Sequence, residues 1–226
     1  MKLAEWPCPL PGGGTANELA LTFDARRQHR LLVIPALFDE ANKLRRLTVE
    51  VMRRLDAAGI DCFLPDLPGT NESLQSLTDQ TVAGWQAAMA EAAFNFGATH
   101  VLAMRGGALV MPMALPGWRY APVKGATILR QLLRGRIVAA REAGRDETQD
   151  ALLAEGLENG LELAGYALGA GFLREFQSLV PGVAVGVSDI AQDMIGDGGL
   201  WLRAEPDEDR VQADTLAAIV AVGIKA

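Results

Sequence analysis

The chain has 226 residues, half of them apolar and 22% charged, which predicts a soluble globular protein with a substantial core. The formal net charge of −7 argues against non-specific binding to nucleic acid and to anionic membrane surfaces. No apolar run approaches the ~20 residues that a transmembrane helix needs. The first residues also lack the apolar segment of a secretory signal. We therefore expect a cytoplasmic protein with two reduced cysteines, Cys8 and Cys62.

The first half of the chain alternates apolar runs with amphipathic segments. Residues 1–16 are rich in proline and glycine and predict a surface turn before or between edge strands, one of which is expected at 19–24. A continuous apolar run at 31–36 is typical of a strand buried on both faces, and further strands are expected at 60–65 and 99–104. Helical periodicity predicts helices between them, at 42–58 and 78–96. Strand, helix, strand, helix, strand is typical of a doubly wound, mostly parallel sheet.

The second half contains more helix than one crossover needs. A helix is expected at 106–114 and a short strand at 118–123. Residues 125–180 are predicted to form a small helical cap over the strand ends. Its expected parts are helices at 126–143, 147–155 and 171–179 and a strand-like piece at 161–168. A final core strand at 183–187 and a helix at 211–222 complete one expected α/β domain, residues 1–226.

Residues 101–109 have the pattern of a strand followed by a tight turn of small residues. Ala103-Met104-Arg105-Gly106-Gly107 matches the small–x–nucleophile–x–small spacing of the nucleophile elbow in α/β hydrolases. Arg105 occupies the position of the nucleophile. A guanidinium stays protonated and cannot attack a carbonyl. About thirty residues earlier, Asp66–Ser73 resembles the Asp-x-x-Gly-x-Gly-x-Ser loop of these hydrolases, with Asn71 replacing the second glycine.

The positions of the two histidines argue against serine-hydrolase chemistry. In α/β hydrolases the histidine follows the serine and the acid along the chain, but His29 and His100 both precede the elbow. The carboxylate pair Asp39-Glu40 has no further ligands at metal-binding spacing, and no phosphate-binding loop is present. We therefore expect no Ser-His-Asp triad, no metal and no cofactor.

The carboxyl ends of the predicted parallel strands define a candidate ligand site, because ligands of open α/β sheets bind there. The residues assigned to it are Phe38, Glu40, Asn42, Asp66, Arg105 and Gly106. Two interpretations of Arg105 remain open. It forms an ion pair with Glu40, Asp39 or Asp66, or its planar fork binds a carboxylate, phosphate or carbonyl oxygen of a ligand. The cap arginines Arg130, Arg134 and Arg136 are interpreted as a solvated helix face.

Four separated motifs resemble one protein family. Val33-Ile-Pro-Ala-Leu-Phe-Asp-Glu-Ala-Asn-Lys-Leu-Arg-Arg46 is similar to the "PF-x-E-x-N-K-x-R-R" stretch of the exosortase A system-associated hydrolase 2 proteins. Met104-Arg105-Gly106-Gly107 resembles the arginine-containing elbow of that family. Pro122–Gly125 with Leu129–Arg134, and Leu163–Leu168, resemble its "P-V-x-x-G … L-R-Q-x-L-R" and "A-G-Y-x-L" segments. Ala36 and Asp39 depart from the pattern. The resemblance implies an α/β-hydrolase-like fold and a role in exopolysaccharide or protein-sorting systems.

Three hypotheses of function follow. The first is a protein without the triad that binds a small anionic or acylated molecule, or a partner, in a capped pocket around Arg105, Glu40 and Asn42. The second is a hydrolase or acyltransferase with Ser73 as nucleophile or Glu40 as base. The third is a structural interaction protein whose pocket is filled by its own side chains. A homodimer is compatible with each of them.

Overall fold

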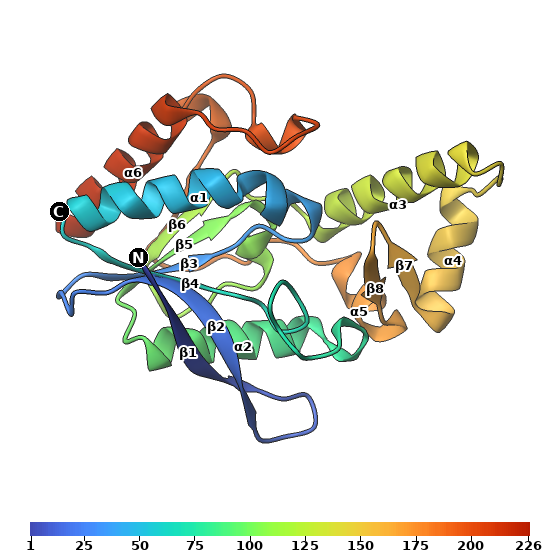
Figure 1. The fold of residues 1–226 in the computed structure, drawn as a ribbon, viewed down its shortest axis with the longest axis horizontal. Helices are drawn as coiled ribbons and strands as arrows, with labels where there is room; N and C mark the ends of the chain where they lie inside the picture. The colour runs from blue at the N-terminus through green and yellow to red at the C-terminus, as the bar shows by residue number, and fades with distance from the viewer.

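The computed structural model describes residues 1–226 and is built around one twisted sheet of seven strands (Figure 1). The strand order is β1-β2-β4-β3-β5-β6-β9. β1 and β2 form an antiparallel hairpin, and β2 is antiparallel to β4. From β4 to β9 every neighbouring pair is parallel. The strand bounds are β1 Lys2–Pro9, β2 Thr15–Phe23, β3 Arg30–Ile34, β4 Asp61–Pro65, β5 His100–Met104, β6 Gly117–Tyr120 and β9 Val187–Ile190.

The central strands β3, β4 and β5 are those that the apolar segments of the sequence predicted. β4 is buried along its whole length, and β3 and β5 are buried except at their first residue. Helices cover both faces, as a parallel sheet requires. Helices α1 (Asp39–Ala57) and α6 (Arg210–Lys225) pack together on one face, and α2 (Val82–Asn95) covers the other (Figure 1). Each face buries its own hydrophobic cluster, one around Leu44 and Leu216, the other around Trp85.

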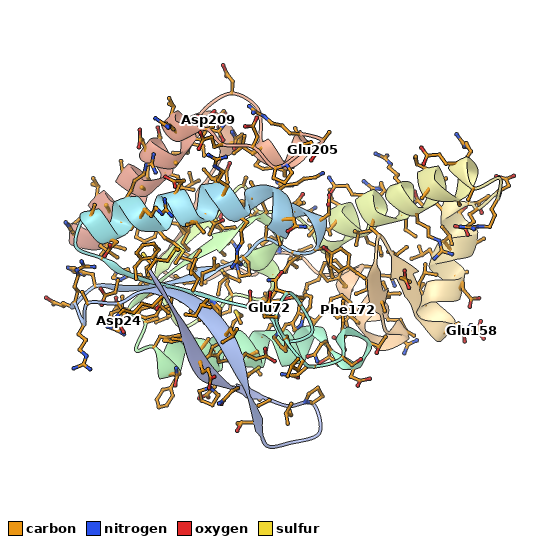
Figure 2. All side chains as sticks on the ribbon, in the orientation of Figure 1. Asp24, Glu72, Glu158, Phe172, Glu205 and Asp209 are labelled. Carbon is orange, nitrogen blue, oxygen red and sulfur yellow. The ribbon has the colours of Figure 1, made fainter.

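The cap lies at the end of the sheet where α1 and α3 begin (Figure 1). Its elements are α3 (Gly125–Glu142), α4 (Gln149–Asn159), the two-stranded ribbon of β7 (Leu161–Leu163) and β8 (Tyr166–Leu168), and α5 (Ala170–Phe176). Its core is joined to the sheet through aromatic contacts. Phe172 of α5, labelled in Figure 2 where the cap meets the body, lies edge-on to Trp85 of α2 at 5.0 Å between ring centres.

The surface turn expected in the N-terminal segment lies at residues 10–14, between strands β1 and β2 at the edge of the sheet. Two other local expectations were wrong. The elbow is followed by a 3-10 helix, Arg105–Leu109, rather than an α-helix reaching residue 114. The last strand begins at Val187, four residues later than expected, and the side chains of Val183 and Val185 are exposed in the preceding loop. None of the helices combines the length and the apolar character that crossing a bilayer requires.

Candidate functional site

The turn after β5 has the strained geometry of a nucleophile elbow. Arg105 has φ 51°, a left-handed conformation that costs an L-residue roughly 1–2 kcal/mol. The glycines after it permit the close packing of this turn. A Cβ at Gly107 would fall against the carbonyl oxygen of Pro35, and one at Gly106 would lie 2.6 Å from Cδ1 of Ile128. Gly106 and Gly107, whose small size predicted the elbow, are therefore required where the turn after β5 packs against the loop after β3.

The guanidinium of Arg105 is held by Glu40, the second residue of α1. Its Nε donates to Glu40 Oε2 at 3.1 Å and its Nη2 donates to Glu40 Oε1 at 2.9 Å. Nη1 donates to the carbonyl oxygen of Ala121 at 2.9 Å. Arg105 is 7% exposed and Glu40 is 5% exposed. Three of the five N–H donors of the guanidinium therefore bind protein oxygens, two of them on Glu40, which agrees with the interpretation of Arg105 as an ion-pair residue.

Trp201 covers the remaining face of this ion pair. The Cζ atom of Arg105 lies 3.8 Å from the centre of the indole ring, a cation–π contact in a desolvated setting. Trp201 belongs to a 3-10 helix, Leu200–Leu202, in the segment that joins β9 to α6. It also packs edge-on against Tyr120, at 5.9 Å between ring centres.

Tyr120 anchors the covering segment to the end of β6. Its hydroxyl donates to Oε1 of Gln192, whose Nε2 in turn donates to the carbonyl oxygen of Gly196 at 3.1 Å. Burial raises the pKa of Tyr120, and the positive charge of Arg105 acts in the opposite direction. Tyr120 is therefore a neutral hydrogen-bond donor that fixes the segment carrying Trp201.

A cavity of about 400 Å³ adjoins the ion pair beneath the cap. This volume is in the range of small-molecule sites. Its lining comes from the start of α1, from α3, from the β7–β8 turn and from the segment of Trp201, as follows: Leu37, Phe38, Asp39, Glu40, Lys43, Ile128, Gln131, Leu132, Gly135, Ala164, Trp201 and Leu202. Seven of these residues are hydrophobic, so the walls are mainly apolar.

The charged groups of the cavity wall are paired with one another or with Arg105. Lys43 Nζ lies 2.8 Å from Asp39 Oδ2, one helical turn apart on α1. Glu40 is neutralised by Arg105, which lies behind the wall and does not line the cavity. The inner surface therefore presents no unpaired charge to a ligand.

Phe38 connects the cavity to the cap. Its backbone has φ 56° and ψ −131°, which turns the chain sharply from β3 into α1. Its ring lies edge-on to Tyr166, Phe172 and Phe176, at 5.2, 6.1 and 5.7 Å between ring centres. The predicted residues Phe38, Glu40, Arg105 and Gly106 are thus brought together.

Asn42 and Asp66 lie at a separate small cleft on the other side of the loop after β3. Asn42 borders this cleft with Arg45 and Asn71. Asn71 Nδ2 donates to Asp66 Oδ1 at 2.8 Å, and Arg45 lies 3.7 Å from the same oxygen. Burial raises the pKa of Asp66, although Asn71 and Arg45 counteract it. Neither Asn42 nor Asp66 lines the cavity.

Ser73 is also separate from the elbow. Its Oγ accepts from the backbone N–H of Gly69 at 2.8 Å and donates to Oε1 of the buried Glu18 at 2.7 Å. Gln75 donates to the same carboxylate oxygen at 2.9 Å. Ser73 therefore closes the loop after β4 onto strand β2.

The two histidines lie at the opposite end of the sheet from Arg105. His100 begins β5 and His29 precedes β3, with 6.5 Å between their ring centres. No group of three or more His, Cys, Asp or Glu side chains is placed to hold a metal ion.

The sequence did not reveal the residues that the cap and the tail contribute to the site. Ile128, Gln131 and Gly135 line the cavity on helical spacing, but that spacing is equally typical of an ordinary core-facing helix. For Trp201 the only sequence signal is a large aromatic residue in a tail that is otherwise polar and glycine-rich.

Comparison with known proteins identifies the fold. The sequence matches no protein-family model and no curated protein. Among solved structures, a presumed hydrolase from Agrobacterium vitis S4 aligns with TM-score 0.63 at 12% identity, over 99% of this chain and 98% of that chain. A bromoperoxidase from Bacillus anthracis aligns with TM-score 0.58 at 9% identity over the whole of both chains. The mouse α/β hydrolase domain-containing protein 10 aligns with TM-score 0.57 at 12% identity, over 100% of this chain and 99% of that chain. At these identities the likeness shows that the chain has the α/β-hydrolase fold.

Proposed function

We propose that this protein is a non-catalytic member of the α/β-hydrolase fold that binds the acyl chain of a small molecule in the cavity beneath its cap. The observation that carries the proposal is the cavity itself, which is about 400 Å³ in volume, mainly apolar and adjacent to the elbow. Apolar walls favour a hydrocarbon chain, because burial of apolar surface stabilises by roughly 25 cal/mol per Å². A ligand anion inside the cavity would find Arg105 already engaged by Glu40, so the acylated ligand is favoured over the anionic one there.

The state of the candidate catalytic groups supports a role in binding. Glu40 could act as a base only after it released Arg105, which would leave a buried guanidinium unpaired. Ser73 already donates its hydroxyl proton to Glu18 and lies in a different part of the molecule. Both histidines are at the far end of the sheet, so a serine–histidine–acid mechanism has no base near the elbow.

The test is a titration with 1-lauroyl-glycerol, a neutral acylated probe, followed by calorimetry. Gly135→Trp should abolish binding while the protein stays folded, because a Cβ at this wall position meets no atom within 4 Å and an indole there has room to fill the cavity. Ala139→Trp, on an exposed part of the same helix and outside the cavity, is the matched control. The proposal fails if the wild-type protein does not bind the probe, or if both variants bind it equally well.

The catalytic alternative is tested on the same preparations with short-chain and lauroyl esters and thioesters. Turnover that disappears in Glu40→Ala or Ser73→Ala, measured on variants that remain folded, would replace the binding proposal by a hydrolase or acyltransferase. We expect no turnover above that of the buffer.

The family relationship is part of the same proposal. It is supported by the motif around residues 33–46, because Phe38, Glu40 and Lys43 of that motif all line the cavity. A cytoplasmic role beside an exosortase or exopolysaccharide system would then require an intact cavity. Deletion of the gene should lower exopolysaccharide output, and the wild-type protein, but not Gly135→Trp, should restore it.

A further inference from the structure

Helix α3 presents cations that have no partner in a protein that is acidic overall. Arg130, Arg134 and Arg141 are exposed and contact no carboxylate, and Lys124 just before the helix is also free. Arg136, on the same helix, forms a bidentate pair with Glu147, at 2.9 and 3.1 Å. Since most arginines of this chain, whose net charge is −7, have a carboxylate partner, the free cations on α3 require an explanation.

One of these arginines is placed beside the cavity mouth. Gln131 and Gly135 form the part of the cavity wall that α3 contributes nearest the solvent, and both are exposed. Arg134 lies between them in sequence, on the adjacent face of the helix. The bare Cα of Gly135 leaves space beside it, since no atom lies within 4 Å of a Cβ built there. A long arginine side chain at 134 can therefore extend over Gly135 to the mouth.

The interior and the rim of the cavity thus differ in charge. Inside, Asp39 is paired with Lys43 and Glu40 with Arg105. Beside the mouth, on the helix face next to Gln131, the exposed Arg134 carries a positive charge that no carboxylate neutralises. An apolar interior with a cationic rim is complementary to an amphiphile with a hydrocarbon chain and an anionic headgroup.

We propose that the ligand is a single acyl chain with an anionic headgroup, a phosphate or a carboxylate, and that Arg134 binds this headgroup at the mouth while the chain occupies the cavity. The proposal rests on the proposed function and specifies the chemistry of its ligand. The guanidinium suits this role because it donates two parallel hydrogen bonds to phosphate or carboxylate oxygens.

The experiment compares two probes that share the lauroyl chain and differ by one phosphate group, 1-lauroyl-glycerol and 1-lauroyl-glycerol 3-phosphate, by calorimetry below their micellar concentrations. The wild-type protein should bind 1-lauroyl-glycerol 3-phosphate about tenfold more tightly than 1-lauroyl-glycerol, a difference of about 1.4 kcal/mol in binding free energy. Arg134→Gln should reduce that preference to within about twofold, and Arg134→Lys should restore part of it, because lysine keeps the charge and loses the fork. Raised salt should weaken the preference in the wild-type protein.

Arg141→Gln is the matched control. This substitution also removes an exposed arginine of α3 that has no carboxylate partner. Arg141 lies seven residues, or about 10 Å along the helix axis, beyond Arg134. The preference for the phosphate should be unchanged in this variant. If Arg134→Gln and Arg141→Gln reduced the preference equally, the exposed arginines of α3 would act only through their overall charge. That result would overturn the role of Arg134.

The outcomes separate this inference from the proposed function. If neither probe binds, the cavity is not an acyl site and both proposals fail. If both probes bind with equal affinity, the acyl site stands and the anionic headgroup is wrong. Co-sedimentation with phosphatidylglycerol vesicles then tests whether α3 binds a membrane surface instead. Binding to vesicles that depends equally on Arg130, Arg134 and Arg141, without binding of the monomeric phosphate, would assign α3 to a membrane surface and overturn the inference.

Discussion

Trp201 lies over the guanidinium of Arg105, with 3.8 Å between Cζ and the ring centre, so that a residue of the C-terminal segment covers the turn after β5. Glu40 holds the same guanidinium from the other side of the sheet edge. The position that a hydrolase would keep open to substrate is therefore closed by the side chains of Arg105, Glu40 and Trp201, which come from distant parts of the sequence. This arrangement is the basis of the predictions that follow.

Removing one member of the buried ion pair should cost more stability than removing both members together. Arg105→Met leaves the Glu40 carboxylate buried without its cation, and we expect a loss of about 3–5 kcal/mol in the free energy of unfolding. The double variant Arg105→Met, Glu40→Met should recover most of that loss, because no buried charge remains. Urea denaturation of the two single variants and the double variant gives the coupling energy. Additive losses in this cycle would contradict the buried-pair interpretation.

The two elbow glycines should differ in how well they tolerate a methyl group. At Gly107 the new Cβ meets backbone oxygens of Pro35 and Ile34, which cannot move aside, so Gly107→Ala should fail to give stable protein. At Gly106 the obstacle is Cδ1 of Ile128, the end of a flexible side chain. Gly106→Ala should cost roughly 1–3 kcal/mol, as overpacking usually does. Ile128→Val, which removes Cδ1, should therefore cost less stability in the Gly106→Ala background than in the wild-type protein, and equal costs in the two backgrounds would disprove the assigned contact.

Ser73→Ala should affect stability rather than ligand binding. The substitution removes an acceptor for Gly69 N–H and a donor to the buried Glu18, and unsatisfied buried groups cost about 1–3 kcal/mol. Binding of 1-lauroyl-glycerol should be unchanged, because Ser73 is not part of the cavity wall. Thermal unfolding and calorimetry on the same sample check both statements. An unchanged melting temperature together with impaired binding would show that Ser73 belongs to the site.

His100 should make the fold less stable in mild acid. Burial, aided by the nearby His29, lowers the pKa of His100. Because the folded-state pKa lies below the unfolded value of about 6.5, the stability is fully present above that value and is lost as the pH falls through the folded pKa. His100→Gln should therefore flatten the dependence of melting temperature on pH between about 7 and 5. Titration of the two imidazoles by NMR provides the independent check, and a midpoint for His100 at or above the usual value would refute it.

The sequence predicted best those parts of the fold in which one physical effect dominates. Strands β3, β4 and β5 are buried on both faces, so their apolar runs have no competing interpretation. The elbow was recognisable because close backbone packing requires small residues at Gly106 and Gly107. The order of the sheet and the helices on its faces then follow from the parallel connections.

The sequence patterns were least informative at the two edges of the sheet. β1 is an edge strand with prolines at positions 7 and 9, next to the hairpin turn, so it lacks the apolar signature of the interior strands. β9 is the opposite edge and carries the polar residues Ser188 and Asp189, while the more apolar run before it is an exposed loop. Glu40 was named as one of three carboxylates that could pair with Arg105, but the choice among Glu40, Asp39 and Asp66 depends on the turn at Phe38, which no local pattern shows.

The covering of Arg105 by Trp201 also has a consequence for biosynthesis. Glu40 and Arg105 are synthesised about a hundred residues before Trp201, and the Tyr120–Gln192 contact that anchors the segment of Trp201 also forms only after Gln192 has been made. Until then the paired charges of the nascent chain remain hydrated, and the edge of the sheet around them is open to chaperones and proteases. Complete dehydration of this ion pair is therefore a late step, and its burial reports that the C-terminal segment has docked.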